Sequence, residues 1–222
     1  MSDFKFPDFI EIDKEKVSMY DYMLRPCKSQ RALHKWIQVF LGLDFPDCIV
    51  CDESTASPMS MIWNVYRAAM EGDTEEASQL YFASRDSFKT LGASIVELLM
   101  LIHVRRTACH MGAISRQSKK CYDYMRNFLN RPVLNQIKQL KETMERTELD
   151  LDTPYNMHPY LQIVICTMQG ANSEHTNFMC VDEVDVVSNV KAYQESKKIP
   201  TETPDKKPSI TMYISTRKSA FG

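Results

Sequence analysis

The stretch that decides the fold joins a short apolar run to a long apolar helix and reads Tyr81-Phe82-Ala83-Ser84-Arg85-Asp86-Ser87-Phe88-Lys89-Thr90. A strand that turns sharply into a helix points free backbone N–H groups and the positive end of the helix dipole at one spot, where an anion can bind. A Lys-[Ser/Thr] pair at the helix start is typical of loops that bind nucleotide phosphates and Mg²⁺. Such loops normally carry glycine at both ends, but here these positions hold Ala83 and Phe88. The stretch therefore predicts a phosphate-binding loop with its glycines replaced. By pattern alone the match is weak, because a Lys-Thr pair at a helix start is most often ordinary surface chemistry.

Composition places the chain among globular proteins. It has 222 residues, 44% hydrophobic and 25% charged, with a net charge of −2, which suits one sizeable core. We expect no transmembrane helix and no secretory signal, and therefore a cytosolic location. The seven cysteines lie scattered in apolar segments, which indicates reduced and mostly buried thiols.

The sequence of residues 1–76 predicts an N-terminal arm followed by a helical region. The arm carries spaced aromatic anchors such as Phe6 and Phe9. Apolar positions at intervals of three and four predict a helix over residues 29–43, and Pro58 opens a second helix that stops before Gly72. Cys48-x-x-Cys51 has ligand types that zinc prefers, but no second cysteine pair follows, so we interpret these residues as ordinary thiols.

Residues 77–222 predict an α/β core. A short buried strand over residues 78–83 leads into the loop, and the helix that follows is so apolar that neighbouring elements must envelop it. Further strands are expected at 107–114, 161–168, 178–181 and 209–214, and a charged helix at 130–148. A strand followed by an enveloped helix is the βα half of a nucleotide-binding unit. The sequence thus predicts a P-loop NTPase fold, with a mostly parallel sheet flanked by helices and an N-terminal helical region.

An acidic pair, Asp182-Glu183, ends the apolar run at 178–181. Metal-dependent nucleotide hydrolysis needs an Asp to hold Mg²⁺ and an adjacent Glu to polarise the attacking water, both at the carboxyl edge of the sheet. Acidic strand ends are also common solubilising features. The separation from Lys89 and Thr90, and the strand contexts, favour the nucleotide interpretation.

A basic cluster begins the helix after the strand at 107–114. It consists of Arg116, Lys119 and Lys120. Carboxyl ends of parallel strands share one edge, so these cations could face a polyanion near the loop. A solvated helix start explains them equally well.

Taken in order, these motifs resemble the large subunit of tailed-phage terminases, the ATPase that pumps DNA into the procapsid. The resemblance covers most of the chain. That family's variant phosphate loop, [Ala/Gly]-Ser-Arg-x-x-x-Lys-Thr, matches Ala83, Ser84, Arg85, Lys89 and Thr90. Upstream, Leu33-His-Lys-Trp-Ile-x-x-Phe-Leu-Gly-Leu and Ser57-Pro58-x-x-x-Ile-Trp-x-x-Tyr look like the helical region that precedes the loop. Ser215-Thr216 resembles the family's coupling motif.

The resemblance implies ATP and Mg²⁺ as cofactors and a role for each matched residue. Residues 83–90 would bind the nucleotide, Thr90 and Asp182 would hold Mg²⁺, and Glu183, Arg85 and Lys89 would be catalytic. Ser215 and Thr216 would couple hydrolysis to movement. Implied partners are double-stranded DNA, the portal protein and the small terminase subunit, in a ring oligomer in the host cytoplasm.

Two departures from the family pattern matter. Phe88 replaces the glycine that lets the backbone approach the phosphates, so its side chain must point away from them. The chain also stops at Gly222, before the further ATPase strands and the nuclease domain that the family carries, so we expect an incomplete core and no nuclease activity. A helicase-like ATPase, a nucleotide-binding or assembly module without turnover, and an unrelated α/β domain stay open as alternatives.

Overall fold

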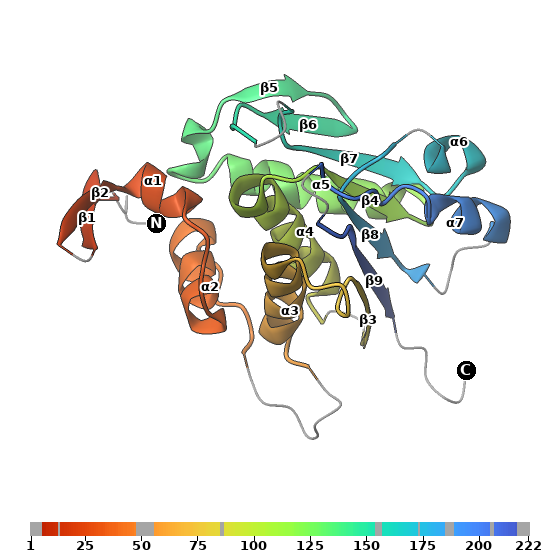
Figure 1. Cartoon of the computed structure of the whole chain (residues 1–222), viewed down its shortest axis with the longest axis horizontal. Helices are drawn as coiled ribbons and strands as arrows, with labels where there is room; N and C mark the ends of the chain where they lie inside the picture. The colour runs from red at the N-terminus through yellow and green to blue at the C-terminus, as the bar shows by residue number, and fades with distance from the viewer. Residues whose placement is uncertain are drawn as a thin grey trace.

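A mostly parallel sheet forms the centre of the molecule (Figure 1). The computed structural model describes residues 6–12, 14–47, 56–84, 87–153, 157–172, 174–184, 189–204 and 207–216. Within these residues the sheet has seven strands. In spatial order they are β3 (Ser78–Ala83), β9 (Ile210–Thr216), β8 (Phe178–Asp182), β4 (Ala108–Gly112), β7 (Tyr160–Ile165), β6 (Arg146–Leu149) and β5 (Gln139–Glu142). The first five are parallel, and β6 and β5 join antiparallel, which confirms the predicted α/β class.

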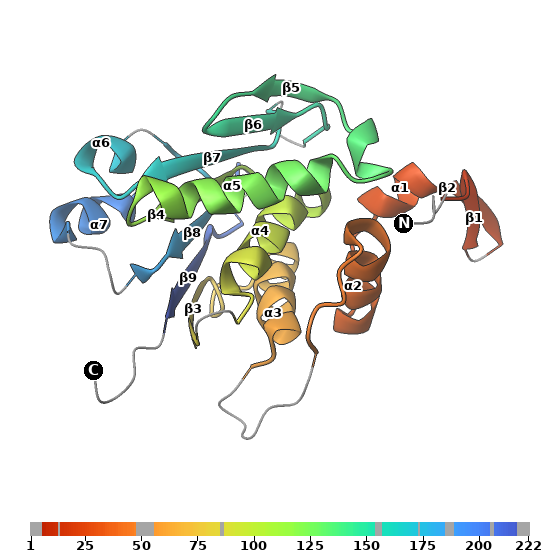
Figure 2. The same cartoon turned by 180° about the vertical axis from the view of Figure 1, so that it is seen from behind.

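Helices cover both faces of this sheet (Figure 2). Three long helices pack on one face: α3 (Pro58–Glu71), α4 (Lys89–Leu99) and α5 (Ser115–Leu129). The short helices α6 (Met168–Ala171) and α7 (Val190–Ser196) lie on the other face, where Ala192 packs against Met179 and Val181 of β8. The α3 and α4 side holds the larger core.

The helix α4 is enveloped, as the sequence predicts. Every residue from Gly92 to Leu99 is buried, and a π-helical turn, Met100–Val104, continues the helix. Gly92 packs so closely on α3 that an added Cβ would lie 2.5 Å from Cε of Met61. The start of α4 is therefore fixed relative to the sheet by the packing of the helix from Gly92 onward.

The N-terminal region follows the predicted helices. The helix α2 (Gln30–Trp36) continues as a π-helical turn, Ile37–Leu41, and ends at Gly42, which has a φ of 61°. In α3, Ser57 caps the helix, Pro58 occupies its first turn and Gly72 ends it, as expected. Its residues Met59 and Tyr66 are fully buried core, and the Tyr66 hydroxyl lies 2.9 Å from the Cys27 amide, which donates to it.

The N-terminal arm is more regular than expected. A hairpin of β1 (Phe9–Ile12) and β2 (Glu15–Ser18) leads into α1 (Met19–Leu24). Phe6 stacks on Phe40 with ring centroids 6.1 Å apart, so it is an anchor as predicted. Phe9, in contrast, is 50% exposed, because it lies in the hairpin away from the core.

The predicted helix at residues 130–148 is wrong. This segment forms a short 3₁₀ turn, Leu134–Gln136, followed by β5 and β6. Val133, Leu134 and Ile137 are buried as a helical pattern would require, but Leu140 is 40% exposed. The β6 strand pairs with β7 and buries Thr147 and Leu149 completely. Pairing with an existing sheet edge supplies the backbone hydrogen bonds that a charged, half-apolar helix would otherwise make by itself.

The strand before the loop has the predicted bounds but is not buried. Its residues alternate between exposed and half-buried, with Leu80 and Phe82 at 54% and 59% exposure. In the described part of the chain β3 has one neighbour, β9, so it is an edge strand. No helix among the described residues is long and apolar enough to cross a membrane. Of the five cysteines in the described ranges, four are buried and all are free thiols, as expected; Cys48 and Cys51 lie outside those ranges.

The packing of α4 can be tested by truncating Leu98, which is fully buried. We expect Leu98→Ala to lower the free energy of unfolding by about 2–5 kcal/mol, because the substitution removes buried surface and leaves a cavity. Urea denaturation measures the difference. Leu140→Ala, the same substitution at a half-exposed position of β5, should cost less than about 1 kcal/mol. Equal losses for the two variants would contradict the packing described.

Candidate functional site

The loop between β3 and α4 lies at the carboxyl edge of the sheet, where β8 and β9 also end. Ala83 closes β3, and Ser84 follows it on the surface. The Ser87 hydroxyl donates a hydrogen bond of 2.7 Å to the carbonyl of Ser84, which holds the two described ends of the loop together. Arg85 and Asp86 lie outside the described residues, so their predicted roles stay predictions.

Phe88 takes the backbone conformation that a glycine would take. Its φ is 63°, in the left-handed region, and it directly precedes the first residue of α4. This conformation costs a residue with a Cβ about 1 kcal/mol or more. The side chain is 46% exposed and packs edge-on against Phe45, with ring centroids 5.6 Å apart. The turn is thus formed without glycine, and the ring has a packing partner of its own.

Thr90 and Asp182 meet across 92 residues of sequence. The Thr90 hydroxyl, in the first turn of α4, donates to Oδ2 of Asp182 at 3.2 Å. Asp182 is the last residue of β8 and pairs in register with Gly112 on one side and Ile214 on the other. The parallel register thus places the acidic end of β8 beside the helix start, as the sequence predicts.

The carboxylate of Asp182 is buried and only partly satisfied. The residue is 2% exposed, and its Oδ1 atom has no hydrogen-bond partner among the described residues. Burial raises the pKa of this carboxyl; the charge of His110 and the bond from Thr90 oppose the rise without cancelling it. An ionised carboxylate oxygen without a partner is costly in this environment. A cation at Oδ1 would remove the cost, and carboxylate and hydroxyl oxygens are ligands that suit Mg²⁺. The residues present therefore fit a magnesium ion held by Asp182 and Thr90.

Glu183 connects the loop lysine to the end of β9. Lys89 Nζ lies 3.2 Å from Glu183 Oε1. The backbone N–H of Thr216 donates to Glu183 Oε2 at 3.0 Å, and its hydroxyl donates to Oε1 at 2.5 Å. Burial alone would raise the pKa of Glu183, but the bonds from Thr216 and Lys89 outweigh it and lower the pKa. Glu183 therefore stays ionised, and its φ of 55° shows that the chain turns sharply to aim it back at the loop.

The two predicted coupling residues differ in position. Thr216 is the last residue of β9 and touches Glu183, whereas Ser215 is fully buried within the strand. Ser215 lies opposite Phe82 of β3 in the parallel register. The structure thus brings Lys89, Thr90, Asp182, Glu183 and Thr216 together, and it places Ser215 one residue behind them.

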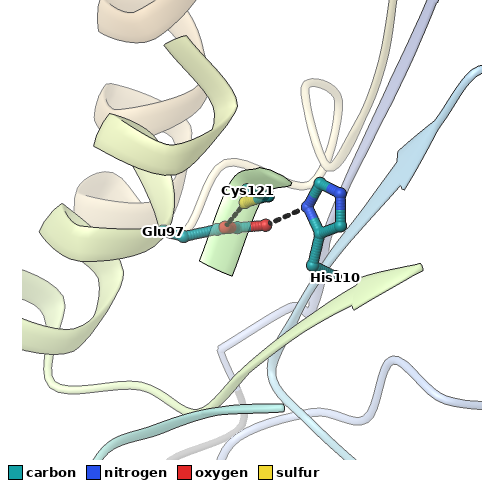
Figure 3. A group of neighbouring side chains, drawn as sticks. All are labelled: Glu97, His110 and Cys121. Atoms are coloured by element: carbon teal, nitrogen blue, oxygen red, sulfur yellow. Dashed lines mark hydrogen bonds and ion pairs between the residues drawn. The ribbon is translucent and has the colours of Figure 1, made fainter. Parts of the chain in front are cut away.

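Three buried polar residues beneath this site were not predicted from the sequence. Glu97 of α4, His110 of β4 and Cys121 of α5 point toward one another (Figure 3), and all three are fully buried. Burial opposes protonation of His110, but the adjacent Glu97 and then Asp182 raise its pKa overall. The signal that could have revealed them is a glutamate inside an enveloped apolar helix together with a histidine inside an apolar strand, since buried charges are seldom left unpaired.

Comparison with known proteins supports the fold. No protein-family model and no curated protein sequence matches the chain. Solved structures, in contrast, do match the chain. The large terminase of bacteriophage HK97 superimposes with a TM-score of 0.58 at 13% identity, over 85% of this chain and 38% of that one. The ATPase domain of the Thermus phage P74-26 large terminase gives 0.52 at 12% identity, over 69% of this chain and 64% of that domain. The large terminase of a thermophilic bacteriophage, in complex with ADP, gives 0.51 at 8% identity, over 70% and 37%.

The chain has the fold of a phage large-terminase ATPase domain. It spans about two fifths of the HK97 terminase and of the ADP-bound terminase, and about two thirds of the P74-26 ATPase domain. At these identities the similarity concerns the arrangement of helices and strands. The terminase-like fold explains why the loop, β8 and β9 end at one edge.

The basic cluster lies at that same edge. Arg116, Lys119 and Lys120 are exposed in the first turns of α5, directly after β4. Beside them is a cavity of about 370 Å³ at the end of β7, lined in part by Lys119, Glu145 and Glu174. The two carboxylates outnumber the one lysine among its charged lining groups, which disfavours a phosphate group there. A role of the exposed cations toward a polyanion stays a prediction.

The backbone conformation of Phe88 can be tested with a pair of variants. We expect Phe88→Gly to be more stable than Phe88→Ala by about 1 kcal/mol, because both lose the ring and only alanine keeps a Cβ at positive φ. The free energy of unfolding of each gives the sign. At Lys120, inside α5, the same pair should show the opposite order by about 1 kcal/mol. The same order at both positions would refute the left-handed conformation of residue 88.

The cost of the Asp182 charge can be tested without any ligand. We expect Asp182→Asn to raise the free energy of unfolding of the metal-free protein at neutral pH, on the order of 1 kcal/mol, because the folded-state pKa lies above the unfolded value. The cost is present when Asp182 is ionised and fades as the pH falls through its folded-state pKa. Chemical denaturation at two pH values measures it. The exposed Asp123→Asn in α5 should change stability by less than about 0.5 kcal/mol; an Asp182→Asn variant less stable than wild type at neutral pH would contradict the prediction.

Proposed function

We propose that this chain is the ATP-hydrolysing motor part of a phage DNA-packaging terminase large subunit. The observation that carries the proposal is the convergence of Lys89 and Thr90, at the start of α4, with Asp182 and Glu183, at the end of β8. An ammonium, a hydroxyl and two carboxylates at one sheet edge are the groups that phosphoryl transfer from a nucleotide requires. The terminase-like fold is consistent with them.

Each side chain has a role that follows from its position. Lys89 would leave Glu183 for the phosphates, and its charge would stabilise the negative charge that develops on them. Thr90 and Asp182 would hold Mg²⁺, which would neutralise negative charge on the phosphates. Glu183, freed from Lys89 and kept ionised by Thr216, would orient and polarise the attacking water. Arg85 would stabilise charge on the γ-phosphate from within the loop.

The bond between Thr216 and Glu183 suggests how hydrolysis would be transmitted. Thr216 ends β9 and is hydrogen-bonded to Glu183, so a movement of Glu183 between Lys89 and water would be transmitted to the end of that strand. We assign the coupling role to Ser215 and Thr216, of which Thr216 contacts Glu183 directly. The wider proposal includes double-stranded DNA as the polymer moved, the portal protein and small terminase subunit as partners, a ring assembly, and the host cytoplasm as location.

A second candidate is a nucleotide-binding or assembly module without turnover. The observation that favours it is Phe88, whose side chain stands where the family has glycine. The ring packs on Phe45, so it is compatible with nucleotide binding. Whether hydrolysis occurs would depend on how closely the phosphates approach the backbone at Phe88. A helicase-like ATPase would use the same loop and acidic pair.

The loop assignment is tested by Lys89→Ala. We expect ATP turnover to fall by at least about 100-fold, because a preorganised positive charge at the phosphates is lost, while circular dichroism stays unchanged. Phosphate release measures turnover, and Lys35→Ala on the exposed side of α2 is the matched control. Equal turnover in wild type and Lys89→Ala would disprove the assignment. Calorimetry with ADP and Mg²⁺ separates the candidates: binding without turnover in the wild type favours the module.

A further inference from the structure

A line of buried polar groups runs from the interior of the helical layer to Asp182. Cys121 Sγ donates to Glu97 Oε2 at 2.7 Å, and Glu97 Oε1 lies 2.7 Å from His110 Nδ1. The other ring nitrogen, Nε2, lies 3.9 Å from Asp182 Oδ2. The elements α5, α4, β4 and β8 thus contribute one group each, and the line ends at the proposed magnesium ligand. Figure 3 shows the first three groups, Cys121, Glu97 and His110.

These groups are spaced as hydrogen-bond partners and not as ligands of one metal ion. Two ligands bound tetrahedrally to zinc at about 2.0–2.1 Å stand about 3.3 Å apart. The Glu97 and His110 atoms are 2.7 Å apart, and so are those of Cys121 and Glu97. Burial and the nearby Glu97 raise the pKa of Cys121 well above its usual range, so the thiol keeps the proton that it donates.

Of the two ring nitrogens of His110, only Nδ1 makes a hydrogen bond within the described residues. Both Glu97 oxygens accept hydrogen bonds, one from Cys121 and one from Nδ1–H of His110. This fixes the plane of the ring. Nε2 then has Asp182 in front of it, and it makes no hydrogen bond within the described ranges. The distance of 3.9 Å is too long for a hydrogen bond, but a shift of the Asp182 side chain by about 1 Å would form one.

The fold leaves Asp182 between two groups. Thr90 approaches Oδ2 from the helix start at 3.2 Å, and His110 faces the same oxygen from the core. His110 lies opposite Cys180 in the register of β4 and β8, two residues before Asp182, so both side chains project from the same face of the sheet. Oδ1 is left without a partner among the described residues. Thr90 on one side and the imidazole of His110 on the other flank Oδ2, so Oδ1 is the oxygen left to receive a cation.

We propose that His110 is a positioning residue for Asp182: anchored at Nδ1 by Glu97, it presents Nε2 to the carboxylate and fixes the orientation in which Asp182 receives Mg²⁺. This inference rests on the proposed nucleotide site. It adds an outer-shell partner for the metal ligand, comparable with the carboxylate–histidine pairs that orient ligands in many metal sites.

Two substitutions separate positioning from simple structural support. The amide nitrogen of asparagine occupies the place of Nδ1, whereas that of glutamine occupies the place of Nε2. His110→Asn therefore keeps the bond to Glu97 and loses the group that faces Asp182, and His110→Gln does the reverse. A purely structural role predicts that asparagine, which keeps the bond inside the core, is the better substitute in every measurement.

The experiment measures ADP affinity by calorimetry, with Mg²⁺ and with EDTA, and thermal unfolding of the ligand-free variants. We expect His110→Asn to weaken ADP binding about 10–100-fold in Mg²⁺ and to leave it unchanged in EDTA. His110→Gln should retain more Mg²⁺-dependent affinity than His110→Asn even though it unfolds at a lower temperature. Equal Mg²⁺-dependent affinity in both variants and wild type would overturn the inference, as would His110→Asn binding more tightly than His110→Gln.

A measurement on the wild type avoids dependence on the folding of the variants. Imidazole nitrogens can be observed by NMR after ¹⁵N-histidine labelling of the five histidines. When Mg²⁺ and ADP are added, we expect the Nε2 signal of His110 to shift and its Nδ1 signal to stay; an unmoved Nε2 signal in the saturated complex would overturn the inference. If the wild type binds ADP with no effect of Mg²⁺ or of Lys89→Ala, the proposed nucleotide site fails and the inference fails with it. A site that responds to both, with no response at His110, refutes the inference alone.

Discussion

The burial of α4 is the constraint on which the rest of the structure depends. From Gly92 onward the helix is enclosed by the sheet, α3 and α5, so its first turn cannot move independently of β8. That first turn carries Lys89 and Thr90, and the end of β8 carries Asp182 and Glu183. A hydrogen bond of 3.2 Å and an ion pair of 3.2 Å then form between residues far apart in the sequence. Packing far from the chemistry sets the geometry at the site.

The pKa values of the two carboxylates of the site are shifted in opposite directions. Glu183 accepts from Thr216 and pairs with Lys89, and its pKa is lowered. Asp182 is more deeply buried and has one oxygen without a partner among the described residues, and its pKa is raised. Two adjacent acids with opposite pKa shifts suit the two different tasks proposed for them, a base for Glu183 and a cation ligand for Asp182. The protein without ligand therefore carries an unfavourable charge at Asp182, which the proposed Mg²⁺ would relieve.

Phe88 shows that the loop geometry does not require the residue that usually provides it. The left-handed turn before α4 exists at φ 63° with a phenyl ring attached, and the contact with Phe45 offsets part of its cost. Phe88 therefore leaves the backbone turn before α4 unchanged. What differs from a glycine loop is that a side chain is attached to the backbone at residue 88.

Sequence by itself determined the main helices, the parallel strands and which polar residues meet at the carboxyl edge of the sheet. Hydrophobic period and caps predicted α2, α3 and α4, and short apolar runs predicted the parallel strands, because these signals are local. The pairing of Lys89 and Thr90 with Asp182 and Glu183 was also predictable, since parallel strands end at one edge. Only the tertiary structure decided that residues 139–149 form β5 and β6, because the free edge of β7 competes with a local helix pattern. Tertiary structure alone also made β3 an edge strand and brought Glu97, His110 and Cys121 beneath Asp182. Contacts between residues that are distant in the sequence produce no periodic pattern in the sequence from which they could be predicted.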